Sequence, residues 1–367
     1  MARTGPEVMR HRRGMMTEHL GVLFAAKPEV REPFELGFAA MNACRWDEAI
    51  AHLQKAAAVT KGLKLVALLN LIGVCRYTQG RLADALRDFE ESARLAEKFG
   101  DKRGKARALG NIGLICRDNG QLDSALRYLE DALTIARAIG HQWAVAINLG
   151  YAGNIYHDKG ELDQALKYYE EALAISREIG DQWVVASSLS NLGSIYHDRG
   201  ELDKALRHHE QALAMSRDNG DLWGTASSLS NIGSIYRDKG RLAEALKYDN
   251  GALKVARNLG HLLGVATDLG NVGLILTDRS EHEQAVPKLA DSLITLLNMG
   301  VANGPRQTLT GLAGCDDKLG RRRLVELLER AGKDDGVIAD LLARVDQMRM
   351  KRPERSKSVR VRPRTTG

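Results

Sequence analysis

The chain has 367 residues, of which 44% are hydrophobic but only 5% are aromatic, so a folded core must be built mainly from Ala, Leu and Ile. The formal net charge of +6 lies in residues 351–367, which hold seven Lys or Arg and one Glu. Residues 1–350 therefore sum to about zero, and the isoelectric point near 9.1 reflects a tail rather than a basic fold.

Residues 1–29 predict a flexible lead-in. A short apolar stretch at 20–26 follows Arg10, Arg12 and Arg13, but Glu18 stands beside it and the run is barely long enough for a signal peptide. We therefore expect a lead-in to the following helices rather than an export signal, and a cytoplasmic protein. No apolar run in the chain approaches the roughly 18 residues that a membrane span needs.

A forty-residue period runs through the middle of the chain and is marked by glycine at three fixed phases. A unit copied at such a period stacks on its neighbours and forms a solenoid. No proline occurs between Pro33 and Pro287, which leaves this stretch free for helices. The glycine sets are Gly80, Gly120, Gly160, Gly200 and Gly240; Gly100, Gly140, Gly180, Gly220, Gly260 and Gly300; and Gly73, Gly113, Gly153, Gly193, Gly233 and Gly273.

The unit from Asp181 to Gly220 shows what each period contains. Asp181 is a preferred N-cap residue, and the apolar residues after it fall on one face of a helix that ends at Gly200. A second apolar stripe ends at Gly220, and Asp221 then caps the next unit. Each period therefore predicts an antiparallel pair of helices with short turns.

The pattern weakens toward both ends of the repeat array. A first unit, with Gly37 and Leu53 at its key positions, is offset from the next by 36 rather than 40 residues. In the seventh unit Ser280 replaces the turn glycine, and Pro287 enters the second helix, which it should kink or delay.

A degenerate eighth repeat keeps only Gly320 in phase, and Asp334 to Met350 reads as a final amphipathic helix. Solenoid ends need polar caps, and these weakened units fit that role. The predicted organisation is a lead-in at 1–29, seven repeats at 30–300, a degenerate repeat and capping helix at 301–350, and a basic disordered tail at 351–367.

The four cysteines lie in different repeats and show no CxxC spacing. We expect reduced, mostly buried thiols rather than a disulfide or a metal site. They are Cys44, Cys75, Cys116 and Cys315.

The helical pair resembles the tetratricopeptide repeat. The positions that carry the resemblance in one unit are Leu192-Gly193, Tyr196, Ala205, His209 and Ala212. The period is 40 residues rather than the usual 34 or so. This length, with an Asn-Leu/Ile-Gly signature at 111–113, 191–193 and 231–233, is similar to the Leu-Gly-Asn spindle-orientation scaffolds, kinesin light chains and bacterial tetratricopeptide regulators.

The resemblance covers roughly residues 30–300 and implies an all-α fold. The implied architecture is a right-handed superhelical solenoid of about seven helical hairpins plus a degenerate eighth. It also implies a concave groove in which such domains hold extended peptides or helices.

The first helix of each unit carries small polar residues where an outward face would carry long charged ones. Their spacing places them on one face of the helix, and Asn there can offer both a donor and an acceptor to a peptide backbone. The predicted groove residues are Asn111, Arg117, Asn154, His157, Ser187, Asn191, Ser194, His197, Ser227, Asn231, Ser234, Arg237 and Asn271.

Each repeated column also has a structural interpretation. Asn and Ser could bond neighbouring helices and so stabilise the stack. We favour a structural role for the Asp column, with each Asp paired to an adjacent basic residue, and inter-repeat packing for the Trp column. The columns are Asp118, Asp158, Asp198, Asp238 and Asp278, with Lys159, Arg199, Lys239 and Arg279 as basic neighbours, and Trp143, Trp183 and Trp223.

The dipeptides His157-Asp158, His197-Asp198 and His208-His209 invite a comparison with metal or acid–base sites. Their repetition with the period favours groove positions, because an enzyme needs one site rather than a ladder. The sequence contains no Walker loop, dinucleotide fingerprint, nucleophile elbow or HExxH motif, and we expect neither catalysis nor a cofactor.

We interpret the chain as a non-catalytic scaffold or adaptor that binds a protein or peptide in its groove. One alternative is a peptide- or ligand-responsive regulator that acts through a partner, since residues 1–33 are too short for a DNA-binding domain. The other is weak, non-specific attachment to nucleic acid or an anionic surface through the tail. No distinct C-terminal G-protein-binding motifs occur, so that activity of the spindle scaffolds is not carried over.

Overall fold

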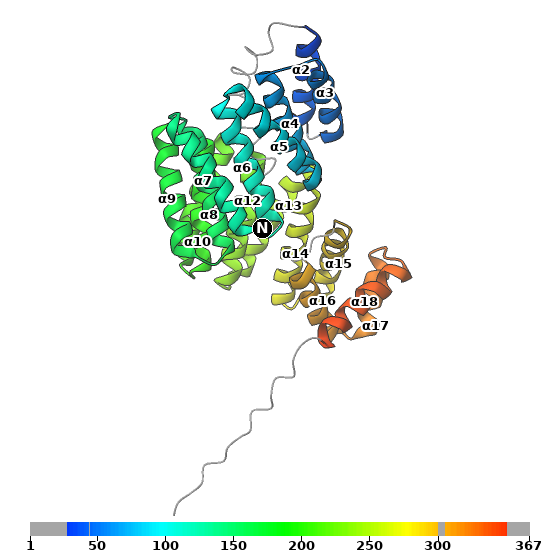
Figure 1. Ribbon diagram of the computed structural model, residues 1–367. Helices are drawn as coiled ribbons and strands as arrows, with labels where there is room; N and C mark the ends of the chain where they lie inside the picture. Colours follow the sequence, from blue (N-terminus) through cyan, green and yellow to red (C-terminus); the bar gives the residue numbers. More distant parts are fainter. Residues whose placement is uncertain (1–27, 44, 300–304, 351–367) are drawn as a thin grey trace, which may run out of the picture. The chain divides into compact units, whose positions relative to one another are not determined.

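The computed structural model describes residues 28–43, 45–299 and 305–350, which form α-helices and no strand (Figure 1). These residues belong to two compact units, divided between residues 235 and 236. The predictions for Cys44, for residues 1–27 of the lead-in and for the basic tail fall outside the described residues, while residues 28 and 29 of the predicted lead-in already belong to a helix. Within them the all-α prediction is confirmed.

The first unit consists of helical pairs that follow the forty-residue period. From α2 to α11, each first helix packs on the second helix of its own pair, and that second helix packs on the first helix of the next pair where the chain continues. The helices are α2 (Pro28–Asn42), α3 (Trp46–Ala58), α4 (Leu63–Thr78), α5 (Leu82–Phe99), α6 (Lys102–Asp118), α7 (Leu122–Ala138), α8 (Gln142–Asp158), α9 (Leu162–Glu178), α10 (Gln182–Asp198), α11 (Leu202–Asp218) and the greater part of α12 (Leu222–Asp238).

The second unit continues the same pattern and then changes. Helices α14 and α15 pack together as a pair, while α16 contacts both of them and the two helices that follow it. The helices are α13 (Leu242–Asn258), α14 (Leu262–Asp278), α15 (His282–Asn298), α16 (Pro305–Leu319), α17 (Arg321–Arg330) and α18 (Asp335–Met350).

A glycine in the first helix lets the two helices of a pair approach closely. At Gly153 an added Cβ would lie 2.6 Å from the ring of Tyr169, and at Gly73 it would lie 2.6 Å from the ring of Phe89. Tyr169 and Phe89 are almost fully buried at these contacts. The large residue of the second helix therefore fills the space that the missing side chain leaves.

The predicted helix ends are confirmed. Asp181 caps α10 by accepting from the backbone N–H groups of Trp183 (3.1 Å) and Val184 (3.0 Å), and Asp221 accepts from the N–H of Trp223 (3.1 Å). Ser280 takes over the turn glycine's role with a φ of +64°, the one non-glycine residue with positive φ in the described ranges.

The expected delay of the helix that contains Pro287 is wrong. Helix α15 begins at His282, one period after α13 begins at Leu242. Proline removes one backbone N–H, but Val286 and Leu289 on either side of it are fully buried. Their packing holds the helix in register despite the lost hydrogen bond.

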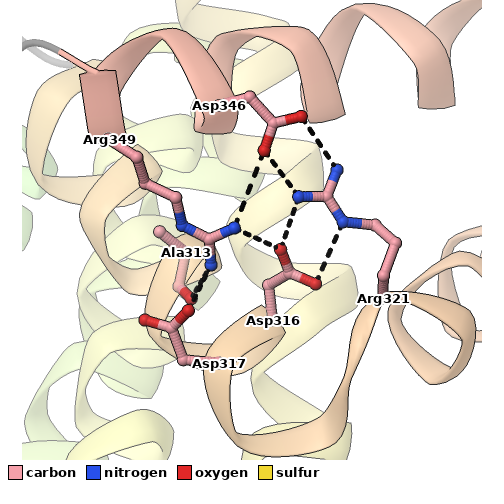
Figure 2. A network of polar contacts seen from close by, with 6 residues as sticks. All are labelled: Ala313, Asp316, Asp317, Arg321, Asp346 and Arg349. Carbon is pink, nitrogen blue, oxygen red and sulfur yellow. Dashed lines mark hydrogen bonds and ion pairs between the residues drawn. The ribbon is translucent and has the colours of Figure 1, made fainter.

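The last three helices are joined by a network of ion pairs (Figure 2). Asp316 of α16 accepts from Arg321 of α17 (2.7 Å) and from Arg349 of α18 (2.9 Å). Arg321 also reaches Asp346 of α18 at 2.6 Å, and Arg349 pairs with Asp317. The predicted final helix is confirmed, and Asp334 caps it by accepting from the N–H of Val337.

Cys75, Cys116 and Cys315 are free thiols and are buried, as the sequence predicts. Burial raises the pKa of all three. These thiols therefore stay protonated near neutral pH and behave as small apolar residues.

Candidate functional site

A groove of about 480 Å³ lies in the first unit on the polar face of the first helices. Helices α8, α10 and α12 supply most of its lining. Nine of the predicted groove residues line it: Arg117, Asn154, His157, Ser187, Asn191, Ser194, His197, Ser227 and Asn231. The structure thus gathers the small polar residues of three successive repeats on one surface.

Two asparagines one period apart lie in this groove with unused hydrogen-bonding groups. The side chains of Asn191 and Asn231 are half-buried, and they make no hydrogen bond to another described residue. A carboxamide carries two N–H donors and one acceptor oxygen, so each has its full capacity available to a bound molecule.

Asn154 is oriented by the residue that packs beneath it. The hydroxyl of Tyr169 donates to Asn154 Oδ1 at 2.6 Å. Burial is the main reason that the pKa of Tyr169 is raised, so the phenol remains a proton donor. The amide oxygen of Asn154 is therefore occupied, and its two N–H donors can face another partner.

The basic column forms polar contacts between successive repeats rather than within them. Arg117 Nε lies 2.5 Å from Asp158 Oδ2, and His157 Nε2 lies 2.5 Å from Asp198 Oδ2. In the second unit Arg237 and Asp278 repeat the contact at 2.7 Å. Each carboxylate comes 41 residues after its partner, which ties one first helix to the next.

This ladder corrects the expectation that each Asp pairs with the adjacent basic residue. Those basic residues pair elsewhere: Lys159 with Asp123 and Glu161, Arg199 with Asp163, and Arg279 with Glu281. Asp158, Asp198 and Asp278 instead have their partners in the preceding repeat. Burial lowers the pKa of Arg117, while the hydrogen bond and charge of Asp158 outweigh burial and raise it.

The asparagines of the column differ in their hydrogen bonds. Asn111 is buried and its Nδ2 donates to Asn70 Oδ1 (3.2 Å), while Asn70 in turn donates to Ser92. In the second unit Asn271 Nδ2 donates to Asp249 Oδ1 at 3.2 Å. These two asparagines hold neighbouring helices together, unlike Asn191 and Asn231. The four predicted residues that do not line the groove are Asn111, Ser234, Arg237 and Asn271.

The packing interpretation of the Trp column fits the structure. Trp183 is 7% exposed and belongs to a cluster with Ala146, from the first helix of the preceding repeat. Trp223 is buried to a similar degree, and Trp143 is half-buried beside the same cluster. Trp183 also forms part of the groove wall.

The two side chains of the His208-His209 dipeptide lie in different environments. His208 stacks on Tyr196 with ring centroids 5.2 Å apart, whereas His209 is fully buried against Gly193. Burial lowers the pKa of His209 to about 3, so it is neutral at physiological pH. No group of three or more His, Cys, Asp or Glu side chains with metal-binding geometry occurs among the described residues.

Several groove residues were not among those predicted from the sequence. Ser190 also lines the groove, and helical spacing places it on the same polar face as Ser187 and Ser194. Tyr169 and Ser216 come from the second helices α9 and α11, and only the packing of the pair brings them to the groove.

Searches for similar proteins give a family and a fold. A profile of the tetratricopeptide repeat matches residues 63–138, 144–218 and 224–293. No match is found among curated proteins. No helix in the described ranges is both long and apolar enough to cross a membrane.

The similar solved structures are helical repeat proteins of low sequence identity. A Rap protein complexed with Competence and Sporulation Factor gives a TM-score of 0.56 at 14% identity, over 88% of this chain and 98% of that one. The apo form of RapI gives 0.54 at 15% identity, over 78% and 97%. BtubC from P. vanneervenii gives 0.46 at 20% identity, over 64% and 91%.

Proposed function

Since the chain belongs to the tetratricopeptide-repeat family, we propose that it is a non-catalytic scaffold that holds a peptide segment of another protein in the groove of α8, α10 and α12. The proposal rests on one observation above all. The groove is lined by small hydroxyl and amide side chains from successive repeats, and Asn191 and Asn231 in it make no hydrogen bond to other described residues.

An extended peptide is the occupant that this lining suits best. Its backbone presents N–H and C=O groups at regular intervals, and carboxamides can bond to both. Ser187, Ser194 and Ser227 are short, so they leave room for a chain to lie between the helices. A row of like groups favours a long ligand over a compact one.

The distribution of polar groups also favours binding over catalysis. The His and Asp side chains of the groove engage in a ladder that repeats with the period, as His157 and Asp198 illustrate. A catalytic site instead needs a single convergent set of groups with distinct roles. The groove offers repetition, which suits recognition of a polymer.

The test uses a library of random dodecapeptides displayed on phage and the full-length chain as bait. Peptides enriched by the wild type should bind the variant Asn191→Ala, Asn231→Ala about 5- to 150-fold more weakly, from the loss of roughly 1–3 kcal/mol of hydrogen bonding. The melting temperature should change little, because these amides bond to no other described residue.

A matched control replaces two amides on the outer helices, Gln164→Ala and Gln211→Ala, which are exposed and do not line the groove. This variant should bind the selected peptides as the wild type does. Equal loss in both variants, or a large fall in melting temperature for the groove variant, would show that the asparagines form a structural ladder instead.

The alternatives named from the sequence stay predictions. The likeness to the Rap proteins is one of fold at 14–15% identity, so a peptide-responsive regulator does not follow from it. Attachment through the basic tail concerns residues 351–367, outside the described ranges.

A further inference from the structure

Two neighbouring turns near the start of the repeat array carry exposed apolar side chains. One turn joins α3 to α4, and the other joins α5 to α6. Val59 is 54% exposed, Leu63 47% and Phe99 44%. The exposed part of such a side chain contributes nothing to the packing of the repeats, so it is available to a partner.

The two turns lie side by side in the first unit. Helices α4 and α6 meet close to their first residues, since a Cβ added at Gly104 would lie 2.7 Å from Val66 Cγ1. Lys105 of α6 also pairs with Glu97 of α5. Residues 59–64 and 98–103 therefore belong to one surface, which we call the turn patch.

The turn patch is basic. It holds five cations against one carboxylate, which gives a net charge of +4. The carboxylate belongs to Asp101, which caps α6 by accepting from the N–H of Gly104 at 2.8 Å. Among the described residues, no hydrogen bond or ion pair holds the side chain of any of the five cations, which are Lys61, Lys64, Lys98, Lys102 and Arg103.

Three of these cations stand where they do not stabilise their helices. Lys64, Lys102 and Arg103 lie in the first turns of α4 and α6, where the positive end of the helix dipole disfavours a cation. Neither first turn holds an acidic residue. The repeat does not require this charge, because uncharged residues take the places of Lys102 and Arg103 in the next three repeats: Gln142-Trp143, Gln182-Trp183 and Leu222-Trp223.

Lysines around exposed apolar side chains suit the surface of an anionic lipid bilayer. The headgroups attract the cations, and the apolar side chains can enter the boundary between headgroups and acyl chains. A Cβ added at Gly62 or Gly100 would meet nothing within 4 Å, so both turns have open space beside them. A nucleic-acid backbone would match the charge of the patch, but its phosphates offer no apolar contact to Val59 or Leu63.

We propose that the turn patch docks the protein on an anionic membrane, with Leu63 and Phe99 as the side chains that enter the bilayer surface. Docking of this kind is peripheral and needs no membrane-spanning helix. None of the residues of the patch lines the groove. The inference therefore goes beyond the proposed function and does not rest on it.

The test measures co-flotation of the full-length chain with vesicles of phosphatidylcholine that contain about 30% phosphatidylserine. In every chain tested, Gln replaces the seven Lys and Arg of residues 351–367, so that the basic tail does not mask the turn patch. This reference chain should bind the anionic vesicles and should not bind vesicles of phosphatidylcholine alone.

The variant Lys61→Gln, Lys98→Gln, Lys102→Gln should bind the anionic vesicles about 100-fold more weakly, because each lysine near such a surface contributes about a fivefold gain. Its melting temperature should not fall, since these side chains hold no other described residue by a hydrogen bond or an ion pair. The variant Leu63→Gln, Phe99→Gln keeps the charge and should bind about tenfold more weakly, because it loses the insertion.

The matched control removes three lysines from the second helices α9 and α13. Lys167→Gln, Lys247→Gln, Lys254→Gln changes the net charge by the same amount, and all three side chains are exposed. This control should bind the anionic vesicles as the reference chain does. Equal loss in the control and in the lysine variant of the patch would show that only the net charge of the chain matters, and would overturn the inference.

The inference is also overturned if the reference chain does not bind anionic vesicles, or if either patch variant binds them as well as the reference chain does. Binding of the reference chain to a random-sequence DNA duplex as tightly as to the vesicles would make the patch a general polyanion site instead. The proposed function fails separately. The Asn191→Ala, Asn231→Ala variant should bind the vesicles normally, whether or not it loses peptides.

Discussion

Tyr169, His209 and Asp249 occupy the same position in three successive repeats, and each has different polar partners. The hydroxyl of Tyr169 donates to Asn154, whereas neither ring nitrogen of His209 has a hydrogen-bond partner among the described residues. Asp249 is 1% exposed, and one of its oxygens accepts from Asn271 while Oδ2 has no such partner. The repeat places a buried side chain at this position. A polar residue there lowers the stability of the fold where its polar atoms lack hydrogen-bond partners.

Asp249 should make the stability of the second unit depend on pH. Burial raises its pKa to about 7, and the hydrogen bond from Asn271 and the charge of Arg237 only partly oppose this. The folded chain therefore holds this proton more tightly than the unfolded chain, whose carboxyl has a pKa near 3.8. Stability should fall as pH rises from about 4 to about 7 and change no further above that range.

Asp249→Asn keeps an acceptor for Asn271 and removes the titration. Its gain in unfolding free energy over the wild type should grow with pH across that window, by on the order of 3 kcal/mol in total. Urea denaturation at pH 5, 6, 7 and 8 measures the difference. A difference that is constant with pH would mean that Asp249 ionises normally in the folded chain.

At the scale of the elements, the caps of the helices use a few adjacent residues, and ion pairs add to the apolar packing of α16, α17 and α18. The caps at Asp181 and Asp221 use only the two or three residues that follow them. Helix α17 is only 10 residues long and buries Leu324 and Leu328. It gains further support from the ion pairs of Figure 2, which hold α16, α17 and α18 together.

Asp316 is the buried centre of that network, since it is 5% exposed and accepts from two arginines. Asp316→Asn should destabilise α16–α18 by about 1–3 kcal/mol, because both guanidinium groups lose a charged acceptor. Amide hydrogen exchange in α17 and α18 measures the effect.

Asp340→Asn is the matched control, because Asp340 is exposed and pairs with Arg344 within α18. It should change stability by less than about 0.5 kcal/mol. Equal effects of the two substitutions would assign the cohesion of these helices to apolar packing alone.

At the scale of the whole molecule, the net charge is concentrated at one end of the sequence. The repeats balance their charges, often in pairs that span a period, while the excess of +6 lies after Met350. Binding to anionic polymers and binding in the groove should therefore be separable.

Deletion of residues 351–367 should abolish binding to a random-sequence DNA duplex at low salt and leave the melting temperature unchanged. For the full chain, the binding constant should fall steeply as salt rises, because the contacts release counterions. Fluorescence anisotropy over a salt series measures the loss of DNA binding on deletion and the salt dependence of binding by the full chain. Replacing the seven Lys and Arg of the tail with Gln is the control for length. DNA binding by the truncated chain at physiological salt would show that the repeats take part.

Much of this fold could be predicted from the sequence because its signals are local. The period, the apolar stripes, the N-cap at Asp181 and the turn at Gly200 each depend on residues within one or two helical turns. The same signals indicated a polar face on the first helices, and nine of the thirteen predicted groove residues line one groove. The residues that resemble the tetratricopeptide repeat are local signals of the same kind, and the match to the family confirms that resemblance.

The partners of those polar residues were decided only by the tertiary structure. Asn111 and Asn191 occupy the same position in their repeats, yet Asn111 bonds to Asn70 of the preceding repeat and Asn191 stays available. Arg117 pairs with Asp158 of the following repeat. Such outcomes depend on which side chain the neighbouring repeat presents about forty residues away, and a pattern read within one repeat does not contain that information.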